Sequence, residues 1–504
     1  MKLWLETSNF PWSPERYHYA AEQMMLTLFP GERPEYPEGP LPRDMSGETN
    51  AVIFTLHRGK KQTNVSALVF QPCGYHNGVV RFPSEQLDEP PEQVYHTVQH
   101  ALKLAFYKAG TALLGAQPPW GALTGVRPVK LPARALLAGK TPKQAQKELE
   151  KEYFVTPARA KLAVDCAQAS VEAQRSLKPG QVSLYIGIPF CPTRCAYCSF
   201  VSADVGRTLK LVEPYVEGLL REVEETGRVL EEAGLSVYSF YMGGGTPTTL
   251  SAEQLDRLLF QCEDCLPLAG CVEFTVEAGR PDTITREKLE VLARHGIGRI
   301  SINPQTLEDQ VLEAIGRKHS AGDIGAAYEL ARAVGFNCIN MDLIAGLPRD
   351  TVDGFRRSLE GVLALGPENI TVHTLALKKG SRLMEEGGRI PSGDEVAIML
   401  DFSRELLITQ GYIPYYLYRQ KYMSGSLENV GWAKPGTESL YNIVMMEELH
   451  TVVSLGAGGV TKLIAPGNIL RLTNPKFPQE YLSGFDKVLG QKAQIKTFYA
   501  ASTQ

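Results

Sequence analysis

The 504-residue sequence contains no long hydrophobic run and no large excess of charge of either sign. No apolar stretch approaches the roughly 20 residues that a membrane-spanning helix requires. Residues 1–9 reach a glutamate and polar side chains before the apolar core of a signal peptide could form. The formal net charge of −4 gives no general attraction for nucleic acid or a membrane surface. We therefore expect a cytoplasmic protein without a membrane span and without a nucleic-acid partner.

Cysteine is also scarce, with nine residues in the chain. An odd number without an export signal argues against a disulfide framework. Three of the nine stand together at C-x3-C-x2-C spacing: Cys191, Cys195 and Cys198. A structural zinc site needs four ligands, and no Cys or His follows Cys198 until Cys262. Cysteine thiolates hold Fe–S clusters, and a four-iron cluster with three protein ligands keeps one iron open for another ligand. The spacing favours such a [4Fe–4S] cluster.

A chain of this length predicts two or three domains. Residues 1–110 have the pattern of an α/β module, with strands near 3–6, 51–56 and 64–70 and helices over 13–28 and 91–107. Residues 111–180 form a helical linker, and from 120 to 178 it carries eleven basic and five acidic side chains, a local charge of +6. This charge could attract a polycarboxylate or nucleic acid, but a solvated helical face explains most of it. His96 and His100 are spaced as metal ligands on one helix but lack a third ligand.

Six β-rich runs follow, at 183–188, 237–242, 272–277, 299–303, 337–343 and 369–375, each with a helical stretch after it. Alternating strands and helices imply parallel strands joined by right-handed crossovers. We therefore predict an α/β fold with a partial (β/α)6 barrel over 181–380 and a smaller C-terminal region over 381–504. In that region the glycine-rich segment 452–460 suits close approach to a ligand or to the barrel, or a buried strand.

Polar or small residues stand where each predicted strand ends, which is where barrel enzymes place their chemistry. The cysteine loop follows the first strand. The later ends carry, in chain order, Gly243 to Thr246, Glu277, Gln305, Asp342 and Ala376. The glycine run allows the backbone to approach a ligand closely. These strand ends predict one shared site.

The three cysteines, with the aromatic Tyr197 before the last one, resemble the radical S-adenosylmethionine (SAM) superfamily. The lead-in Tyr-Ile-x-Ile-Pro-Phe that ends at Cys191 and the motif Gly-Gly-Gly-Thr-Pro-Thr at 243–248 resemble the oxygen-independent coproporphyrinogen III oxidase family. The long N-terminal extension is similar to that of its HemZ-type branch. The resemblance covers about residues 181–465. It implies a radical SAM barrel, a HemN-like C-terminal region, a [4Fe–4S] cluster and SAM.

The resemblance also implies two SAM molecules and their contacts. To the SAM on the cluster it assigns Tyr185, Gly244 and Glu277, with Glu277 as a partner of the ribose hydroxyls. To a second SAM it assigns Tyr197, Gly245, Thr246, Gln305, Arg317, Asp342 and Ala376. A guanidinium at Arg317 could bind a carboxylate with two parallel hydrogen bonds, although capping of a helix end is an alternative. No residue is identified as directly catalytic.

The activity implied by the resemblance is oxidative decarboxylation of coproporphyrinogen III to protoporphyrinogen IX by a 5′-deoxyadenosyl radical, a step of haem biosynthesis. A reduced flavodoxin- or ferredoxin-type protein would donate the electron. Phe200 stands where the oxidases have a fourth cysteine, as in the branch that resembles haem chaperones. A haem chaperone, with His373 as a candidate iron ligand, and a radical enzyme for another tetrapyrrole therefore remain alternatives. Cys262, Cys265 and Cys271 could suggest a second cluster, but buried single thiols are preferred.

Overall fold

The computed structural model describes residues 1–6, 10–13, 15–37, 50–198, 203–376, 390–420 and 423–502. The chain divides into two compact units. The first consists of Met1–Pro128, Ala138–Val164 and Gly425–Leu427, and the second of Val129–Leu137, Asp165–Ser424 and Glu428–Gln504. The finer division into 1–110, 111–180, 181–380 and 381–504 stays a prediction. In the described part, no helix is both long and apolar enough to cross a membrane.

The first unit is built on a four-stranded sheet in the order β1 (Lys2–Leu5), β2 (Ala51–Arg58), β3 (Gln62–Gln71) and β4 (Gly74–Pro83). Strand β1 is parallel to β2, and the other pairs are antiparallel. Alternate residues of β2 face the helices α1 (Glu15–Leu28) and α2 (Pro91–Leu114) and join their core. The strand β4 was not predicted. His100 packs its ring on Tyr153, with centroids 5.1 Å apart, so it has a packing partner in this unit.

Three further helices follow, α3 (Lys130–Leu137), α4 (Pro142–Tyr153) and α5 (Pro157–Ser176). The start of α4 shows why the helical prediction for this segment is correct. The Thr141 hydroxyl accepts from the backbone N–H of Gln144, and the Gln144 side chain accepts from the backbone N–H of Thr141. This reciprocal capping satisfies donors that the first turn leaves without partners.

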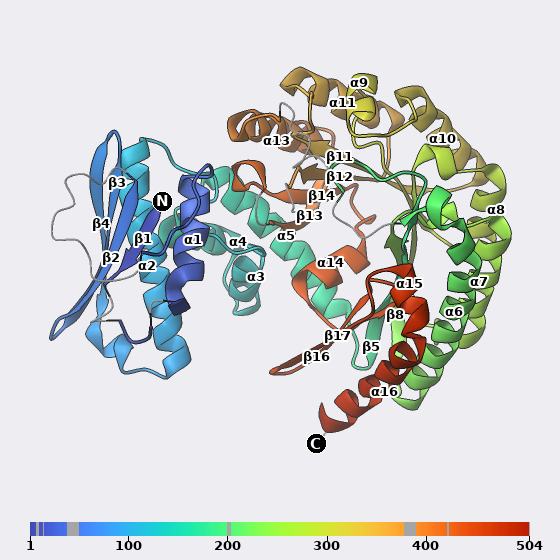
Figure 1. Ribbon diagram of the computed structural model, residues 1–504, viewed down its shortest axis with the longest axis horizontal. Helices are drawn as coiled ribbons and strands as arrows, with labels where there is room; N and C mark the ends of the chain where they lie inside the picture. The colour runs from blue at the N-terminus through green and yellow to red at the C-terminus, as the bar shows by residue number, and fades with distance from the viewer. Residues whose placement is uncertain are drawn as a thin grey trace. The chain divides into compact units, whose positions relative to one another are not determined.

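The second unit contains an eleven-stranded sheet with seven parallel strands at its centre. In spatial order these are β15 (Val452–Leu455), β5 (Gln181–Ile188), β8 (Ser236–Gly244), β9 (Glu273–Gly279), β10 (Arg299–Ile302), β11 (Cys338–Ala345) and β12 (Asn369–Thr374). The last six are the predicted strands. Helices cover the outside of the curved sheet (Figure 1): α6 (Val205–Glu232), α7 (Ala252–Cys265), α8 (Arg286–Arg294), α10 (Ala321–Val334) and α11 (Val352–Leu365). This is the partial barrel that the sequence predicts.

The C-terminal region extends both edges of this sheet. On one side β12 pairs with β14 (Asn429–Ala433), which pairs with β13 (Ile413–Tyr418), both antiparallel. On the other side β15 is followed by β16 (Val460–Ala465) and β17 (Asn468–Thr473). The glycine-rich segment approaches the barrel closely, because a Cβ on Gly456 would lie 2.4 Å from the carbonyl oxygen of Gly187. Residues 452–455 therefore form a strand that continues the barrel.

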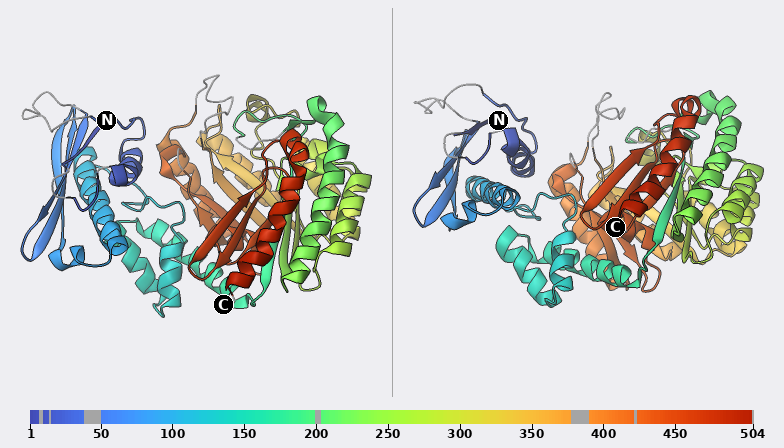
Figure 2. Two further views of the ribbon diagram at one scale, coloured as in Figure 1. Left: turned by 60° about the horizontal axis from the view of Figure 1, so that its bottom comes forward. Right: turned by 90° about the horizontal axis from the view of Figure 1, so that it is seen from below.

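The last helices, α15 (Pro478–Ser483) and α16 (Phe485–Ser502), pack on α6 (Figure 2). Their anchor is Glu222 of α6, whose side chain is fully buried. Its carboxylate accepts from the Tyr481 hydroxyl at 2.6 Å, the Gly456 backbone N–H at 2.8 Å, the Asn474 amide at 2.9 Å and the Lys492 ammonium at 2.9 Å. A buried carboxylate with this many donors ties the C-terminus and β15 to the barrel.

Candidate functional site

The cysteine loop begins where β5 ends. Cys191 closes the short strand β6 (Phe190–Cys191), and Cys195 and Cys198 follow in a turn. All three are partly exposed, and no disulfide joins any of the nine cysteines, all of which lie in the described part. The Ala196 backbone N–H donates to the carbonyl of Ile315 at 3.0 Å. The loop is therefore held against the segment that follows α9 (Asp309–Ala314).

The glycine run at the end of β8 lies against this loop. Gly245 donates its backbone N–H to the carbonyl of Ile188 at 2.7 Å, and Thr246 donates to Phe190 at 2.8 Å. A Cβ on Gly245 would lie 2.5 Å from the Phe190 carbonyl oxygen and 3.0 Å from the Cys191 sulfur. Any larger residue would push the loop away. The Thr246 hydroxyl also reaches the Cys191 sulfur at 3.6 Å.

Arg317 lies on the other side of the loop and is buried. Its guanidinium donates to the carbonyl of Asn303 and to the Tyr197 hydroxyl, the latter at 3.4 Å. Burial lowers the pKa of Arg317, but the neighbouring Tyr197 and Cys195 outweigh this effect and raise it. The Arg317 Nε atom has no hydrogen-bond partner among the described residues. This buried cation is suited to an anion at the loop.

In the barrel interior, Glu277 contacts Tyr241 and lies close enough to Tyr185 to add to the effect of burial, which raises the pKa of that tyrosine. The Tyr241 hydroxyl donates to Glu277 Oε1 at 2.7 Å. A Cβ on Gly243 would lie 2.9 Å from the Glu277 carboxyl carbon, and one on Gly244 would lie 3.4 Å from the Tyr185 hydroxyl. Burial raises the pKa of Glu277 to about 7, and the nearby Asp342 adds to the shift. Tyr185, Gly244 and Glu277, predicted to share one ligand, therefore surround one part of the interior.

Gln305, three residues past the end of β10, and Asp342 of β11 are neighbours. The Gln305 backbone N–H donates to the carbonyl of Asp342 at 2.8 Å. Gln305 has a left-handed backbone with φ of 69°, an uncommon conformation for a residue with a side chain. The Asp342 carboxylate lies 3.7 Å from His373 Nε2 and accepts from the Asn340 amide at 2.8 Å. Burial raises the pKa of Asp342, but hydrogen bonds from His373 and Asn340 outweigh it and lower the pKa.

Ala376 lies two residues past β12 and pairs with Met423. Besides the pair of Gln305 and Asp342, most of the predicted residues form three groups of direct neighbours. The first joins Cys191, Gly245 and Thr246, and the second joins Cys195, Tyr197 and Arg317. The third joins Tyr185, Gly244 and Glu277, with Asp342 close enough to affect the charge of Glu277. Ala376 has no direct contact with these groups among the described contacts.

Sequence reasoning missed three residues of the interior. Tyr241 stacks on Tyr441 with ring centroids 4.6 Å apart, and Tyr441 belongs to α14 (Leu440–Glu447), far along the chain. Tyr418 of β13 lies 3.4 Å from His373 Nδ1. For Tyr241 a signal existed, because it lies two residues before Gly243 and so faces the same side of the strand. Tyr441 and Tyr418 had none, because only the folded chain brings them to the barrel.

A [4Fe–4S] cluster fits the cysteine loop. It carries negative charge on its thiolates, and the buried guanidinium of Arg317 lies beside Cys195. Within the described residues, no three His, Cys, Asp or Glu side chains meet as ligands of one metal ion. That result is compatible with a cluster, because each thiolate binds a different iron. Cys262 is buried, and Cys271 lies with its sulfur 3.3 Å from the Glu273 carbonyl, so these cysteines have packing roles of their own.

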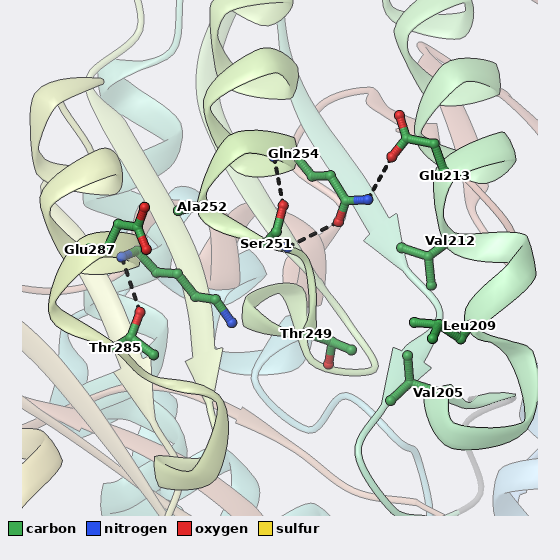
Figure 3. Close-up of a pocket in the computed structure, with 11 residues that line it drawn as sticks. Val205, Leu209, Val212, Glu213, Thr249, Ser251, Ala252, Gln254, Thr285 and Glu287 are labelled. Carbon is green, nitrogen blue, oxygen red and sulfur yellow. Dashed lines mark hydrogen bonds between the residues drawn. The ribbon is translucent and has the colours of Figure 1, made fainter.

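A pocket of about 500 Å³ lies between the first turns of α6, α7 and α8 and contains none of the predicted residues (Figure 3). Two of its polar side chains already have hydrogen-bond partners. The Gln254 amide donates to Glu213 at 2.6 Å, and the Lys288 ammonium donates to the carbonyl of Thr248 at 2.6 Å. This pocket therefore adds nothing to the site at the cysteines.

Residues 185–360 match the family model of the radical SAM superfamily. The oxygen-independent coproporphyrinogen-III oxidase-like protein HemZ of Bacillus subtilis is 40% identical over 412 residues, covering 80% of this chain and 82% of that protein. This match is longer than the segment 181–504, so it includes part of the N-terminal extension. The haem chaperone HemW of Bacillus subtilis is 33% identical over 266 residues, covering 52% of this chain and 66% of that protein. The solved structure of coproporphyrinogen III oxidase (HemN) from Escherichia coli shares the fold, with a TM-score of 0.52 at 23% identity, covering 64% of this chain and 72% of that one.

Proposed function

The chain belongs to the radical SAM superfamily and, within it, to the HemZ-type branch of the oxygen-independent coproporphyrinogen III oxidase family, and we propose that it converts coproporphyrinogen III to protoporphyrinogen IX. When bound, the cluster and SAM would supply an organic radical that takes a hydrogen atom from a substrate propionate, forming 5′-deoxyadenosine. The substrate would then release carbon dioxide and pass one electron to an external one-electron acceptor, which leaves a vinyl group. The radical chemistry comes from these cofactors, and the protein orients them and excludes water.

One observation carries this proposal: the end of the second barrel strand and Arg317 both contact the cysteine loop. Thr246 reaches Cys191, and Arg317 reaches Tyr197. Cys191, Cys195 and Cys198 would hold the cluster. Tyr185, Gly244 and Glu277 would hold the SAM on its open iron, with Glu277 accepting from the ribose hydroxyls.

A second SAM would lie between the remaining predicted residues: Tyr197, Gly245, Thr246, Gln305, Arg317, Asp342 and Ala376. Arg317 is suited to its carboxylate, because a guanidinium binds carboxylates through two hydrogen bonds. Asp342 is suited to its ammonium group, because His373 and Asn340 lower the pKa of Asp342. Asp342→Ala and Gln305→Ala should impair coupled turnover and leave the cluster content unchanged. A loss of SAM cleavage itself would move these residues to the first SAM.

The substrate carries four propionates, so it requires fixed cations near the radical. Candidates are the basic segment 120–178 and Arg317. Lys378 and Lys379 are further candidates, and they lie outside the described residues. We also propose that a reduced flavodoxin- or ferredoxin-type protein supplies the electron and that the protein is cytoplasmic.

The alternative function is that of a haem chaperone, which uses the same cluster and does not convert porphyrinogen. The observation that favours it is His373, a partly exposed imidazole on β12 whose two nitrogens lie near Asp342 and Tyr418. An imidazole in the barrel interior could bind the iron of haem. A third candidate is a radical enzyme for another tetrapyrrole.

The deciding experiment is an anaerobic single-turnover assay with reductant, SAM and coproporphyrinogen III. Substrate that has lost one or two carbon dioxide units, with matching 5′-deoxyadenosine, supports the dehydrogenase. No decarboxylation with an intact cluster, together with tight haem binding that His373→Ala abolishes, supports the chaperone instead.

The cluster itself is tested separately. Cys195→Ser should abolish the oxygen-labile cluster after anaerobic reconstitution, because each thiolate holds one iron. Cys262→Ser is the matched control and should retain it. Full cluster occupancy in Cys195→Ser would refute the assignment.

A further inference from the structure

Arg280, just past the end of β9, connects the third barrel strand to the cysteine loop. Its side chain is only 4% exposed. Through Nη1 it donates to both the carbonyl oxygen and the hydroxyl of Thr193, at 3.1 and 2.7 Å. Thr193 lies midway between Cys191 and Cys195. A buried cation thus holds the backbone between the first two cysteines.

Asp282 sets the orientation of this guanidinium. Arg280 Nε and Nη2 donate to its two carboxylate oxygens, each at 3.0 Å. The four bonds occupy both edges of the planar guanidinium, one toward Asp282 and one toward Thr193. A lysine ammonium is a point charge without this geometry and could not make both sets of contacts.

Arg280 is the principal partner of the Asp282 carboxylate, because His319 on the opposite side of Asp282 makes no hydrogen bond to it. His319 Nδ1 is 4.0 Å from Asp282, and neither ring nitrogen has a hydrogen-bond partner among the described residues. Burial, with smaller contributions from Arg317 and Arg280, lowers the pKa of His319 to about 4, so the ring is neutral at physiological pH. Both Asp282 and His319 line a cavity of about 360 Å³, so tight packing does not fix the carboxylate from that side.

The loop is also held from the opposite direction. The Thr193 hydroxyl donates to the carbonyl of Gly316 at 3.3 Å, and the next residue, Arg317, reaches Tyr197. Two arginines from different parts of the barrel therefore hold the loop on both sides of Cys195. Arg317 belongs to the proposed SAM contacts, whereas the described hydrogen bonds of the Arg280 guanidinium go to Thr193 and Asp282.

We propose that Arg280 is a positioning residue that fixes the cysteine loop in the conformation that accepts the cluster, and that Asp282 keeps Arg280 aligned. This inference rests on the proposed role of the three cysteines in cluster binding. The proposal concerns the conformation of the loop before any cofactor binds, so the mobility of the loop can be measured on the protein without its cluster.

The test is hydrogen exchange of the cluster-free protein, followed over peptides that contain residues 191–198. Arg280→Gln and Arg280→Lys should both speed exchange of the loop about tenfold, because each loses bonds to Thr193 or Asp282. Thr193→Val keeps the carbonyl contact and should have a smaller effect. Arg332→Lys is the matched control, because Arg332 makes a forked bond to Glu368 at 2.9 and 2.8 Å, away from the loop.

Two further readouts separate positioning from general stability. After anaerobic reconstitution, Arg280→Lys should bind less iron or give a changed electron paramagnetic resonance signal in the reduced state, with an unchanged unfolding midpoint. Loop exchange and iron binding at wild-type levels in both Arg280 variants would overturn the proposal. So would faster exchange across the whole barrel with a lower midpoint. If instead Cys195→Ser retains the cluster while the Arg280 variants loosen the loop, the assignment of the cysteines to the cluster fails, and Arg280 orders the loop without a role in cluster binding.

Discussion

Glu273 and Glu277 lie four residues apart on the same face of β9, yet the structure uses them in opposite ways. Glu273 accepts from the Ser439 hydroxyl at 2.9 Å and from the backbone N–H groups of Leu440 at 2.6 Å and Tyr441 at 3.3 Å. Its carboxylate therefore caps the N-terminus of α14, where backbone donors and the helix dipole favour a negative charge. The protein itself therefore supplies these hydrogen-bond donors to the Glu273 carboxylate.

Glu277 has fewer donors and a different electrostatic environment. The Tyr241 hydroxyl is its side-chain partner, and burial together with Asp342 raises the pKa of Glu277 to about 7. The comparison teaches that a carboxylate whose oxygens already accept several hydrogen bonds from the protein, such as that of Glu273, has a structural role. A carboxylate with spare acceptor capacity, at the end where the strands finish, is suited to a ligand.

The largest effect should come from replacing the saturated carboxylate. Glu273→Gln places an amide N–H group against backbone donors that are buried with it. We expect a loss of about 3 kcal/mol in the free energy of unfolding, typical of removing one partner from a buried charged network. Urea unfolding measures it. Glu277→Gln is the matched control on the same strand, and an equal loss there would contradict the division of roles.

Glu277→Gln should instead weaken the binding of SAM to the cluster-loaded protein. A hydrogen bond to a charged group contributes about 1.5–3 kcal/mol, so the dissociation constant should rise by about ten- to a hundredfold. Calorimetric or spectroscopic titration measures the affinity, and iron content should stay at the wild-type level. Surface Glu287→Gln serves as the control. Unchanged affinity would remove Glu277 from the site.

The third prediction concerns pH. The pKa of Glu277 in the folded protein lies above its ordinary value of 4.5, at about 7. Its contribution to stability is therefore complete below about 4.5 and is lost as the pH rises through about 7. SAM affinity should change in the opposite direction, because the ionised carboxylate is the better acceptor for ribose hydroxyls. Both pH dependences should flatten in Glu277→Gln, and persistence of either would point to another group.

The smallest effect should follow from Tyr241→Phe. The Tyr241 hydroxyl lowers the pKa of Glu277, so its removal should move the midpoint of the pH dependence upward. One hydrogen bond contributes about 1 kcal/mol, which corresponds to a shift of less than about one pH unit. Tyr441→Phe is the control, because Tyr441 stacks on Tyr241 and does not donate to Glu277. A downward shift in Tyr241→Phe would refute this reading.

The strand positions were predictable because burial on both faces gives parallel strands a recognisable apolar pattern. All six predicted strands are present, and five of their ends bring predicted residues next to the cysteine loop or to one another. The glycine run was predictable because glycine has no Cβ. At position 245 a Cβ would lie close to the Cys191 sulfur. The sequence did not predict which residues outside the strand–helix repeat contact the barrel interior.

The local sequence by itself determined the cysteine spacing, the strand and helix alternation and the residue at each strand end. These features depend on neighbouring residues and on a regular repeat. Tertiary structure alone decided that β15 continues the barrel beside β5 and that Tyr441 stacks under Tyr241. It also decided that Arg280 holds Thr193 and that Glu273 caps α14. Each of these contacts joins residues distant in the chain, and such pairs leave no periodic signal because their distance in the sequence does not set their distance in space.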